Sequence, residues 1–155
     1  MVSRILVPLD GSKLAEGVLP SVEVLAGQLH AEVYLVEIVD VKSEAWPKAE
    51  EPPHPVSGQS EWEARGIQTA VDYLSGVAAA LQAKNVDAKW EVAEGVAATS
   101  IVNFAHSHAV DLIAMSTHGR SGLSRLVFGS VADQVMREAG IPVLLVRPDH
   151  KAGQE

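Results

Sequence analysis

The pattern of hydrophobic and polar positions divides the chain into two kinds of segment. Short apolar runs with the length of buried strands lie at residues 4–9, 32–39, 88–92, 112–116 and 143–147. Between them, apolar residues recur every three or four positions, as on one face of an amphipathic helix, at residues 13–29, 61–83, 97–108 and 130–139. Strands that alternate with helices are typical of βαβ units, so the sequence predicts an α/β fold with a mostly parallel sheet.

This alternation predicts a three-layer sandwich in which helices cover both faces of a five-stranded parallel sheet with strand order 3-2-1-4-5. In that order the first and fourth strands are neighbours, at the point where the winding direction reverses. Ligands of such sheets bind at that point, outside the carboxyl ends of the strands. We therefore expect the turn at residues 8–12 and the glycine-containing loop at residues 116–130 to meet at one crevice.

Length and composition favour one domain. At 155 residues the chain is long enough to bury a core without disulfides, and we place the domain at residues 1–149. Residues 40–60 are rich in proline and acidic residues and are expected to form a flexible loop. Residues 150–155 are expected to form a disordered tail.

Charge and composition exclude several classes of partner. The net charge of −8 argues against binding of nucleic acid, which needs a broad basic face, and no apolar run approaches the roughly 18 residues of a membrane span. The sequence contains no cysteine, which excludes disulfides and thiolate metal sites. Because Pro8 and Asp10 also interrupt the first apolar run, which is unlike a signal peptide, we expect a cytoplasmic protein with no membrane partner.

The segment from Ser116 to Ser130 carries the strongest chemical signal. It holds three glycines together with serines, arginines and a histidine, and no carboxylate lies between Asp111 and Asp133. Such a locally positive loop, followed by the N-terminus of a predicted helix, is suited to binding an anion such as a phosphate group. The alternative is structural: the glycines form an ordinary loop, and Ser130 and Asp133 form a capping box. No Walker A sequence occurs, which argues against a P-loop fold.

Three separated motifs of the chain resemble the universal stress protein family. The spacing of that family's nucleotide-binding signature, Gly-x-x-Gly, nine residues, Gly-Ser/Thr, is followed by Ser116, Gly119, Gly129 and Ser130. Residues 5–12 resemble the family's first strand and turn, and residues 141–146 resemble its last strand. The resemblance implies a fold of the adenine nucleotide alpha-hydrolase type and, in the ATP-binding branch of the family, ATP in the crevice.

One position departs from the signature, because Ser116 stands where the family has its first glycine. If the backbone at this position needs a positive φ, a serine is costly there. If it does not, the serine is harmless and its hydroxyl is available to bind a ribose.

The resemblance also implies which residues contact the nucleotide. They come from the first turn, the end of the second strand and the glycine-containing loop: Pro8, Leu9, Asp10, Ile38, Met115, Ser116, His118, Gly119, Arg120, Gly129, Ser130 and Val131. Asp10 should face the adenine amine or the ribose, because a carboxylate repels phosphates, although an Asx-turn would also explain it. Ile38 is equally explained as a core residue, and His118 as an exposed loop residue.

The resulting hypothesis is a stress-response or regulatory protein that binds ATP, alone or with Mg²⁺, without fast turnover, because no general base is evident in the sequence. We assign no catalytic and no metal-binding residue. The alternatives are a nucleotide-free dimeric interaction module and a slow ATP hydrolase or nucleotidyl transferase. A homodimer is expected because pairing of the apolar last strand with its copy would cover an exposed sheet edge, at Val143, Leu144, Leu145 and Val146.

Overall fold

A computed structural model of the chain describes residues 1–39, 57–117 and 129–147. Its strands form one parallel sheet in the order β3-β2-β1-β4-β5, built from β1 (Arg4–Pro8), β2 (Glu32–Val39), β3 (Ala88–Glu94), β4 (Leu112–Ser116) and β5 (Val143–Val146). The helices are a short 3₁₀ helix η1 (Ala15–Val18), α1 (Leu19–Leu29), α2 (Ser57–Gln82), α3 (Ala97–Ser107) and α4 (Ser130–Glu138). The predicted α/β fold and its strand order are confirmed.

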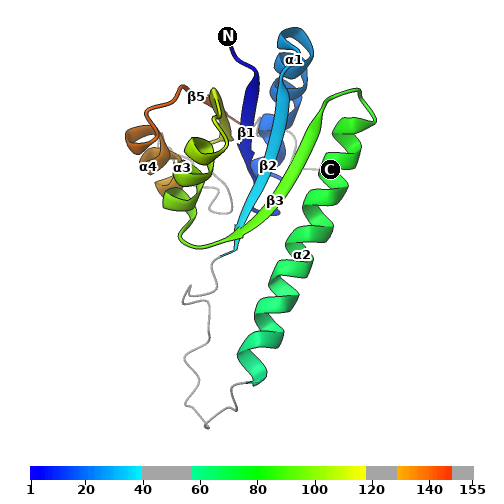
Figure 1. Cartoon of the computed structure of the whole chain (residues 1–155), viewed down its shortest axis with the longest axis vertical. Coiled ribbons are helices and arrows are strands. Elements are labelled where there is room, and N and C mark those ends of the chain that lie inside the picture. The colour runs from blue at the N-terminus through cyan, green and yellow to red at the C-terminus, as the bar shows by residue number, and fades with distance from the viewer. Residues whose placement is uncertain (40–56, 118–128, 148–155) are drawn as a thin grey trace.

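The sheet separates two hydrophobic cores, as expected for strands whose side chains point alternately to opposite faces. In β1, Ile5 and Val7 pack against α1 and α2, whereas Leu6 packs against α3 and α4, and all three are fully buried. Figure 1 shows the two helix layers on opposite faces of the sheet. Because β1 lies in the middle of the sheet and is covered on both faces, its residues after Arg4 form a continuous apolar run.

The first helical segment differs from the prediction. The expected helix at residues 13–29 is divided into η1 and α1, and Pro20 lies in the first turn of α1. Proline has no N–H, so it cannot continue the α-helical hydrogen bonds across this point, and the Leu19 N–H instead reaches back to the Glu16 carbonyl in a 3₁₀ bond. At the two ends of the segment, Leu14 and Leu29 are 36% and 42% exposed rather than buried.

The predicted loop at residues 40–60 is wrong at its end, since Ser57 already begins α2. The sequence is consistent with this boundary: the last proline before the helix is Pro55, and no proline follows it within α2. Residues 40–56 and the predicted tail at 150–155 lie outside the described residues. Within the described segments, no helix combines the length and the apolar character needed to cross a bilayer.

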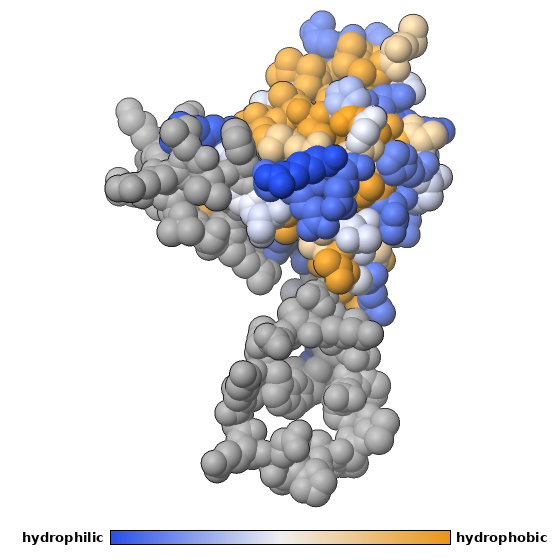
Figure 2. Space-filling model, turned by 90° about the vertical axis from the view of Figure 1, so that its left-hand side faces the viewer, coloured by the Kyte–Doolittle hydropathy of each residue, from blue (hydrophilic) through white to orange (hydrophobic). Residues whose placement is uncertain are grey.

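The two edges of the sheet are strands β3 and β5. In β3 the side chain of Trp90 is 38% exposed, and the predicted edge position of this strand is correct. All four residues of β5 are half-buried although all are apolar. Apolar side chains gather in the upper part of the side of the molecule that carries β5 and α4 (Figure 2). The β5 edge is therefore an apolar strand that is only partly covered by the described part of the chain.

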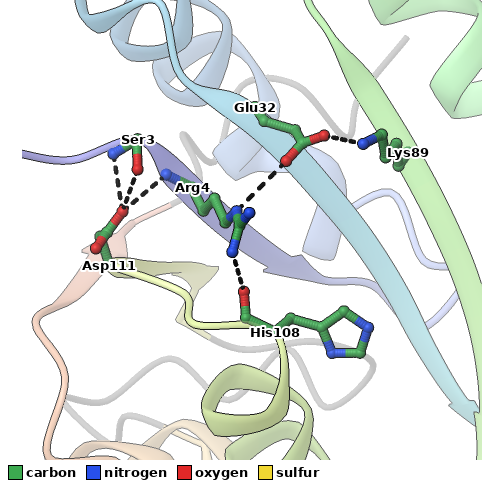
Figure 3. Close-up of polar contacts among 6 residues, drawn as sticks. All are labelled: Ser3, Arg4, Glu32, Lys89, His108 and Asp111. Carbon is green, nitrogen blue, oxygen red and sulfur yellow. Dashed lines mark hydrogen bonds and ion pairs between the residues drawn. The ribbon is translucent and has the colours of Figure 1, made fainter.

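A polar network joins the strands at their amino ends (Figure 3). The Asp111 carboxylate, just before β4, accepts hydrogen bonds from the Ser3 N–H (2.8 Å), the Ser3 hydroxyl (2.9 Å) and the Arg4 N–H (3.0 Å). These bonds stabilise the charged carboxylate and lower its pKa, the backbone bond from Ser3 contributing most. The Asp111 N–H donates in return to the Arg4 carbonyl, so one residue fixes the start of β1 to the start of β4.

The same network extends to the β3 edge. The Arg4 guanidinium donates to the His108 carbonyl at 2.9 Å and lies 3.6 Å from the Glu32 carboxylate, which also pairs with Lys89. The hydrogen bond from Lys89 lowers the pKa of Glu32. The network therefore links β1, β2 and β3 at the end of the sheet opposite to the carboxyl ends of the strands (Figure 3).

Candidate functional site

A cavity of about 270 Å³ lies at the carboxyl ends of β1, β2 and β4, beside the first turns of α3 and α4. Its volume is close to the lower end of the range of small-molecule sites. Nine of its lining residues were predicted to contact a nucleotide: Pro8, Leu9, Asp10, Ile38, Met115, Ser116, Gly129, Ser130 and Val131. The structure thus brings residues from four separate segments around one space, at the crevice expected for this strand order.

Three other predicted contact residues, His118, Gly119 and Arg120, lie outside the described residues. The structure therefore describes the cavity without most of the glycine-containing loop. The described walls of the cavity come from the strand ends and from the first turns of the helices.

Sequence reasoning missed five residues of the cavity wall, which are Ala15, Val36, Ala97, Ile101 and Ala132. Two of them had a readable signal. Val36 precedes Ile38 by two positions in a strand, so both side chains point to the same face. Ala97 opens a helix directly after a strand of a parallel sheet, and such helix N-termini lie beside the carboxyl ends of the strands. The other three, Ala15, Ile101 and Ala132, carry no such signal.

One wall of the cavity is apolar. Val36 and Ile38 at the end of β2, together with Ala97 and Ile101 on α3, give the cavity an apolar lining. Ile38 therefore belongs to the second core and also lines the cavity, so the two explanations offered for it are compatible. A flat apolar group such as a heterocyclic base is the kind of ligand that this wall suits.

The turn between β3 and α3 requires a glycine. Gly95 has a φ of +146°, and a Cβ at this position would lie 2.5 Å from the Ser100 hydroxyl oxygen. Its N–H donates to the Val39 carbonyl at 3.1 Å. The turn places Ala97 at the cavity, and no side chain caps the N-terminus of α3.

Asp10 lies at the cavity edge, directly after β1. Its Oδ1 accepts hydrogen bonds from the Ser12 N–H at 2.9 Å and from the Ser12 hydroxyl at 2.5 Å. The Ser12 oxygen in turn accepts a bond from the Ala15 N–H at 3.1 Å, and Gly11 between them has a φ of +82°. Asp10 therefore forms the Asx-turn considered above and also lines the cavity, so its structural role does not remove it from the site.

Two further carboxylates, those of Glu16 and Glu37, act together with Asp10 on one buried phenol. Tyr73 on α2 has a buried hydroxyl, and burial raises the pKa of this phenol, with the charges of Glu16, Glu37 and Asp10 raising it further. The carboxylates of three different segments thus act on the same phenol. Of these three carboxylates only that of Asp10 lines the cavity, and it favours a ligand group that donates hydrogen bonds over an anion.

Ser116, the residue that replaces the signature glycine, is accommodated without strain. It ends β4, and it is not among the positive-φ residues of the described chain. Its hydroxyl donates a hydrogen bond to the Ala15 carbonyl at 3.1 Å, which ties the end of β4 to η1. The cost considered for a serine at this position does not arise, because the backbone here is that of a strand.

The first turn of α4 also lines the cavity. Gly129 is the N-cap residue and Ser130 the first helical residue, and among the described residues no side chain caps this end, since glycine has none. The predicted capping box of Ser130 and Asp133 is therefore wrong: Ser130 lies one position too late, and the Asp133 N–H bonds to the Gly129 carbonyl at 3.0 Å. N–H groups of an uncapped first turn carry partial positive charge and are suited to an anionic group.

The cavity is thus polarised. The Asp10 carboxylate and the first turn of α4, at Gly129 and Ser130, line the same cavity and carry charge of opposite sign. Within the residues that the structure describes, no group of three or more histidine, aspartate or glutamate side chains is placed to hold a metal ion.

Comparison with known proteins identifies the family of the chain. Residues 1–147 match the sequence profile of the Universal stress protein family. Universal stress protein MJ0531 of Methanocaldococcus jannaschii is 31% identical over 157 aligned residues, which cover 97% of this chain and 85% of that protein. The solved structure of protein MJ0577 from the same organism is 25% identical and has a TM-score of 0.81, with 97% of this chain and 99% of that chain covered.

A more distant solved structure is the universal stress protein from Archaeoglobus fulgidus in complex with dAMP, which is 18% identical. Its TM-score is 0.64, and the match covers 94% of this chain and 97% of that chain. At this identity the likeness concerns the fold alone. The profile match over residues 1–147 and the MJ0531 relative carry the assignment: this chain belongs to the universal stress protein family.

Proposed function

We propose that this chain binds an adenine nucleotide, with ATP as the ligand, in the cavity at the carboxyl ends of β1, β2 and β4. The observation that carries the proposal is the convergence of nine expected contact residues on one cavity of about 270 Å³. The dAMP bound by a structural neighbour in the same family adds support for an adenine nucleotide as the class of ligand. The function proposed is that of a nucleotide-binding regulatory protein of the stress response.

The polarity of the cavity supports one orientation of the nucleotide. The phosphates would lie at the first turn of α4, where each contact with an N–H group at the helix end contributes about 0.3–1 kcal/mol. The adenine would lie against the apolar wall formed by Val36, Ile38, Ala97 and Ile101. Asp10 would face donor groups of the nucleoside, because its charge would repel phosphates.

Under this proposal the protein hydrolyses ATP slowly or not at all. Asp10 is the only ionisable side chain among the described residues that line the cavity. Its Oδ1 is engaged by Ser12, so it is poorly placed to activate a water for attack on a distant phosphate. Mg²⁺ would enter with ATP rather than be held by a protein site of its own. A cytoplasmic location, where ATP is available, is part of the same proposal.

The proposal is tested by denaturing the purified protein and separating any released nucleotide by chromatography. In parallel, thermal unfolding with and without ATP measures binding, because a ligand at 100 times its Kd adds about 2.7 kcal/mol to stability. The absence of both a released nucleotide and a thermal shift would favour the nucleotide-free interaction module. ATP hydrolysis above the solution rate that depends on Asp10 would favour the slow hydrolase.

Two glycine-to-valine substitutions, one at the cavity and one away from it, provide a test variant and its control. We expect Gly129→Val to abolish the thermal shift with ATP, because a branched side chain at the N-cap would stand over the first-turn N–H groups of α4. Gly27→Val is the control: Gly27 lies on α1 away from the cavity, and a Cβ there meets no atom within 4 Å. If Gly129→Val keeps the thermal shift with ATP, the first turn of α4 is not part of the binding site.

We also propose a homodimer through β5. Its four apolar residues are half-buried at a sheet edge, and such an edge invites pairing with a second strand. Leu144→Lys places a charge on this edge and should halve the molar mass measured by light scattering, while circular dichroism stays that of a folded protein. A wild-type protein that is monomeric at micromolar concentration would contradict the proposal.

A further inference from the structure

The hydroxyl of Ser116 has a fixed orientation in this fold. It donates its proton to the Ala15 carbonyl at 3.1 Å, and the residue lines the cavity. A serine hydroxyl has one proton to donate and two lone pairs that accept. Because the proton is directed at Ala15, the oxygen offers the cavity an acceptor and no donor.

Asp10 offers the same kind of group from the neighbouring strand. Strands β1 and β4 are paired, and Asp10 and Ser116 line the cavity where these two strands end. The Asp10 carboxylate is held in place by the two hydrogen bonds that its Oδ1 accepts from Ser12. Two side-chain acceptors on adjacent strands thus border one part of the cavity, and the ligand group that matches them is one with hydroxyl donors.

The position of this acceptor pair within the cavity indicates which part of a nucleotide it meets. In the sheet β1 lies between β2 and β4, so the ends of β1 and β4 follow the apolar residues at the end of β2, and Gly129 and Ser130 of α4 line the same cavity. In a nucleotide the sugar connects the base to the phosphates. If the base takes the apolar wall and the phosphates the helix end, the sugar hydroxyls face the ends of β1 and β4.

We propose that Ser116 is a specificity-determining residue that accepts a hydrogen bond from a ribose hydroxyl and so selects ribonucleotides over deoxyribonucleotides. The inference rests on the proposed function, since it concerns the same cavity. It assigns to Ser116 a role that depends on its side-chain oxygen, which a glycine at this position does not have. The bond to Ala15 is what makes the residue an acceptor rather than a donor.

The test compares the Kd values of ATP, 2′-deoxy-ATP and 3′-deoxy-ATP by isothermal titration calorimetry. One hydrogen bond changes affinity by about three- to tenfold. We expect the wild-type protein to prefer ATP over at least one of the deoxynucleotides by this factor. In Ser116→Ala that preference should fall to within about twofold, because ATP is weakened while the deoxynucleotide that lacks the bonded hydroxyl is not. Ser116→Gly should lose the preference in the same way.

Ser107→Ala is the matched control. The Ser107 hydroxyl also donates to a backbone carbonyl at 3.1 Å, that of Phe104, but Ser107 does not line the cavity. The control variant should keep the wild-type preference. A purely structural role of Ser116, as the link between β4 and η1, would lower the melting temperature without changing the ratio of the Kd values.

The outcomes separate this inference from the proposed function. If the wild-type protein binds ATP and Ser116→Ala weakens all three nucleotides equally, or changes none of them, the role of Ser116 is refuted while adenine nucleotide binding stands. If the wild-type protein binds none of the three nucleotides, the proposed function fails and the inference fails with it.

Discussion

Substitution of Asp111 tests whether the amino ends of the strands stabilise the fold independently of the cavity at their carboxyl ends. Its carboxylate accepts three hydrogen bonds from Ser3 and Arg4 at the amino ends of the strands, far along the sheet from the cavity at their carboxyl ends. Asp111→Ala removes all three. The expected result is a less stable protein whose affinity for ATP is unchanged, because no residue of the cavity wall is altered.

The magnitude follows from the number and exposure of these bonds. A hydrogen bond contributes about 0.5–1.5 kcal/mol net, and the lower part of that range applies here because the site is half-exposed and water replaces part of each bond. Three bonds then give a loss of about 2 kcal/mol in the free energy of unfolding. For a chain of this size, that corresponds to a melting temperature lower by about 4–8 °C.

The loss should depend on pH in a defined direction. The hydrogen bonds lower the pKa of Asp111 in the folded protein below its ordinary value of 3.8. A lowered pKa means that the stabilisation is present above the unfolded value and is lost as the pH falls through the folded value. Urea unfolding should therefore show the full difference between Asp111→Ala and wild type at neutral pH, and a smaller difference below pH 3.8.

Asp87→Asn is the control, because Asp87 is exposed and its substitution should change stability by less than about 0.5 kcal/mol. A difference between Asp111→Ala and wild type that stays constant from neutral to acidic pH would refute the role of the charged carboxylate. A changed Kd for ATP in Asp111→Ala would refute the separation of the two ends of the sheet.

Two further substitutions test the core and the cavity. The Tyr73 hydroxyl is buried and has no hydrogen-bond partner within the described part of the chain, so Tyr73→Phe should leave stability unchanged or raise it by up to about 1 kcal/mol in urea unfolding. Because the pKa of Tyr73 is raised, wild type should lose stability above pH 10 relative to Tyr73→Phe, and an equal pH dependence of the two would contradict this. Ala97→Leu fills part of the apolar wall and should weaken ATP binding at least tenfold by calorimetry without lowering the melting temperature; unchanged binding would place the base elsewhere.

The strands were the most predictable part of the fold. The bounds expected for β2 and β4 agree with those in the structure, at Glu32–Val39 and Leu112–Ser116. Strands of a parallel sheet are covered on both faces, so their sequences are continuous apolar runs that polar or turn residues interrupt at each end. The order of the sheet followed from the alternation of strands with helices and from the handedness of the crossovers.

The beginnings of α3 and α4, at Ala97 and Ser130, agree with the prediction, whereas other features of the helix starts do not. Pro20 divides the first helical segment, and α2 begins at Ser57, before its expected start. At the start of α4 the capping box expected for Ser130 and Asp133 does not form, because Gly129 takes the N-cap position. Hydrophobic periodicity specifies the middle of a helix, whereas its first turn depends on which backbone groups the neighbouring segments leave to be satisfied.

The sequence by itself determined the order of the elements and the residues at the carboxyl ends of β1, β2 and β4, because these depend on local patterns. Only the tertiary structure decided how these residues act together. The bond from Ser116 to Ala15 joins positions 101 residues apart, and the apolar wall combines the end of β2 with the first turns of α3. Such relations depend on the distances between segments, which local sequence preferences do not encode. Packing of the two cores against the sheet sets those distances.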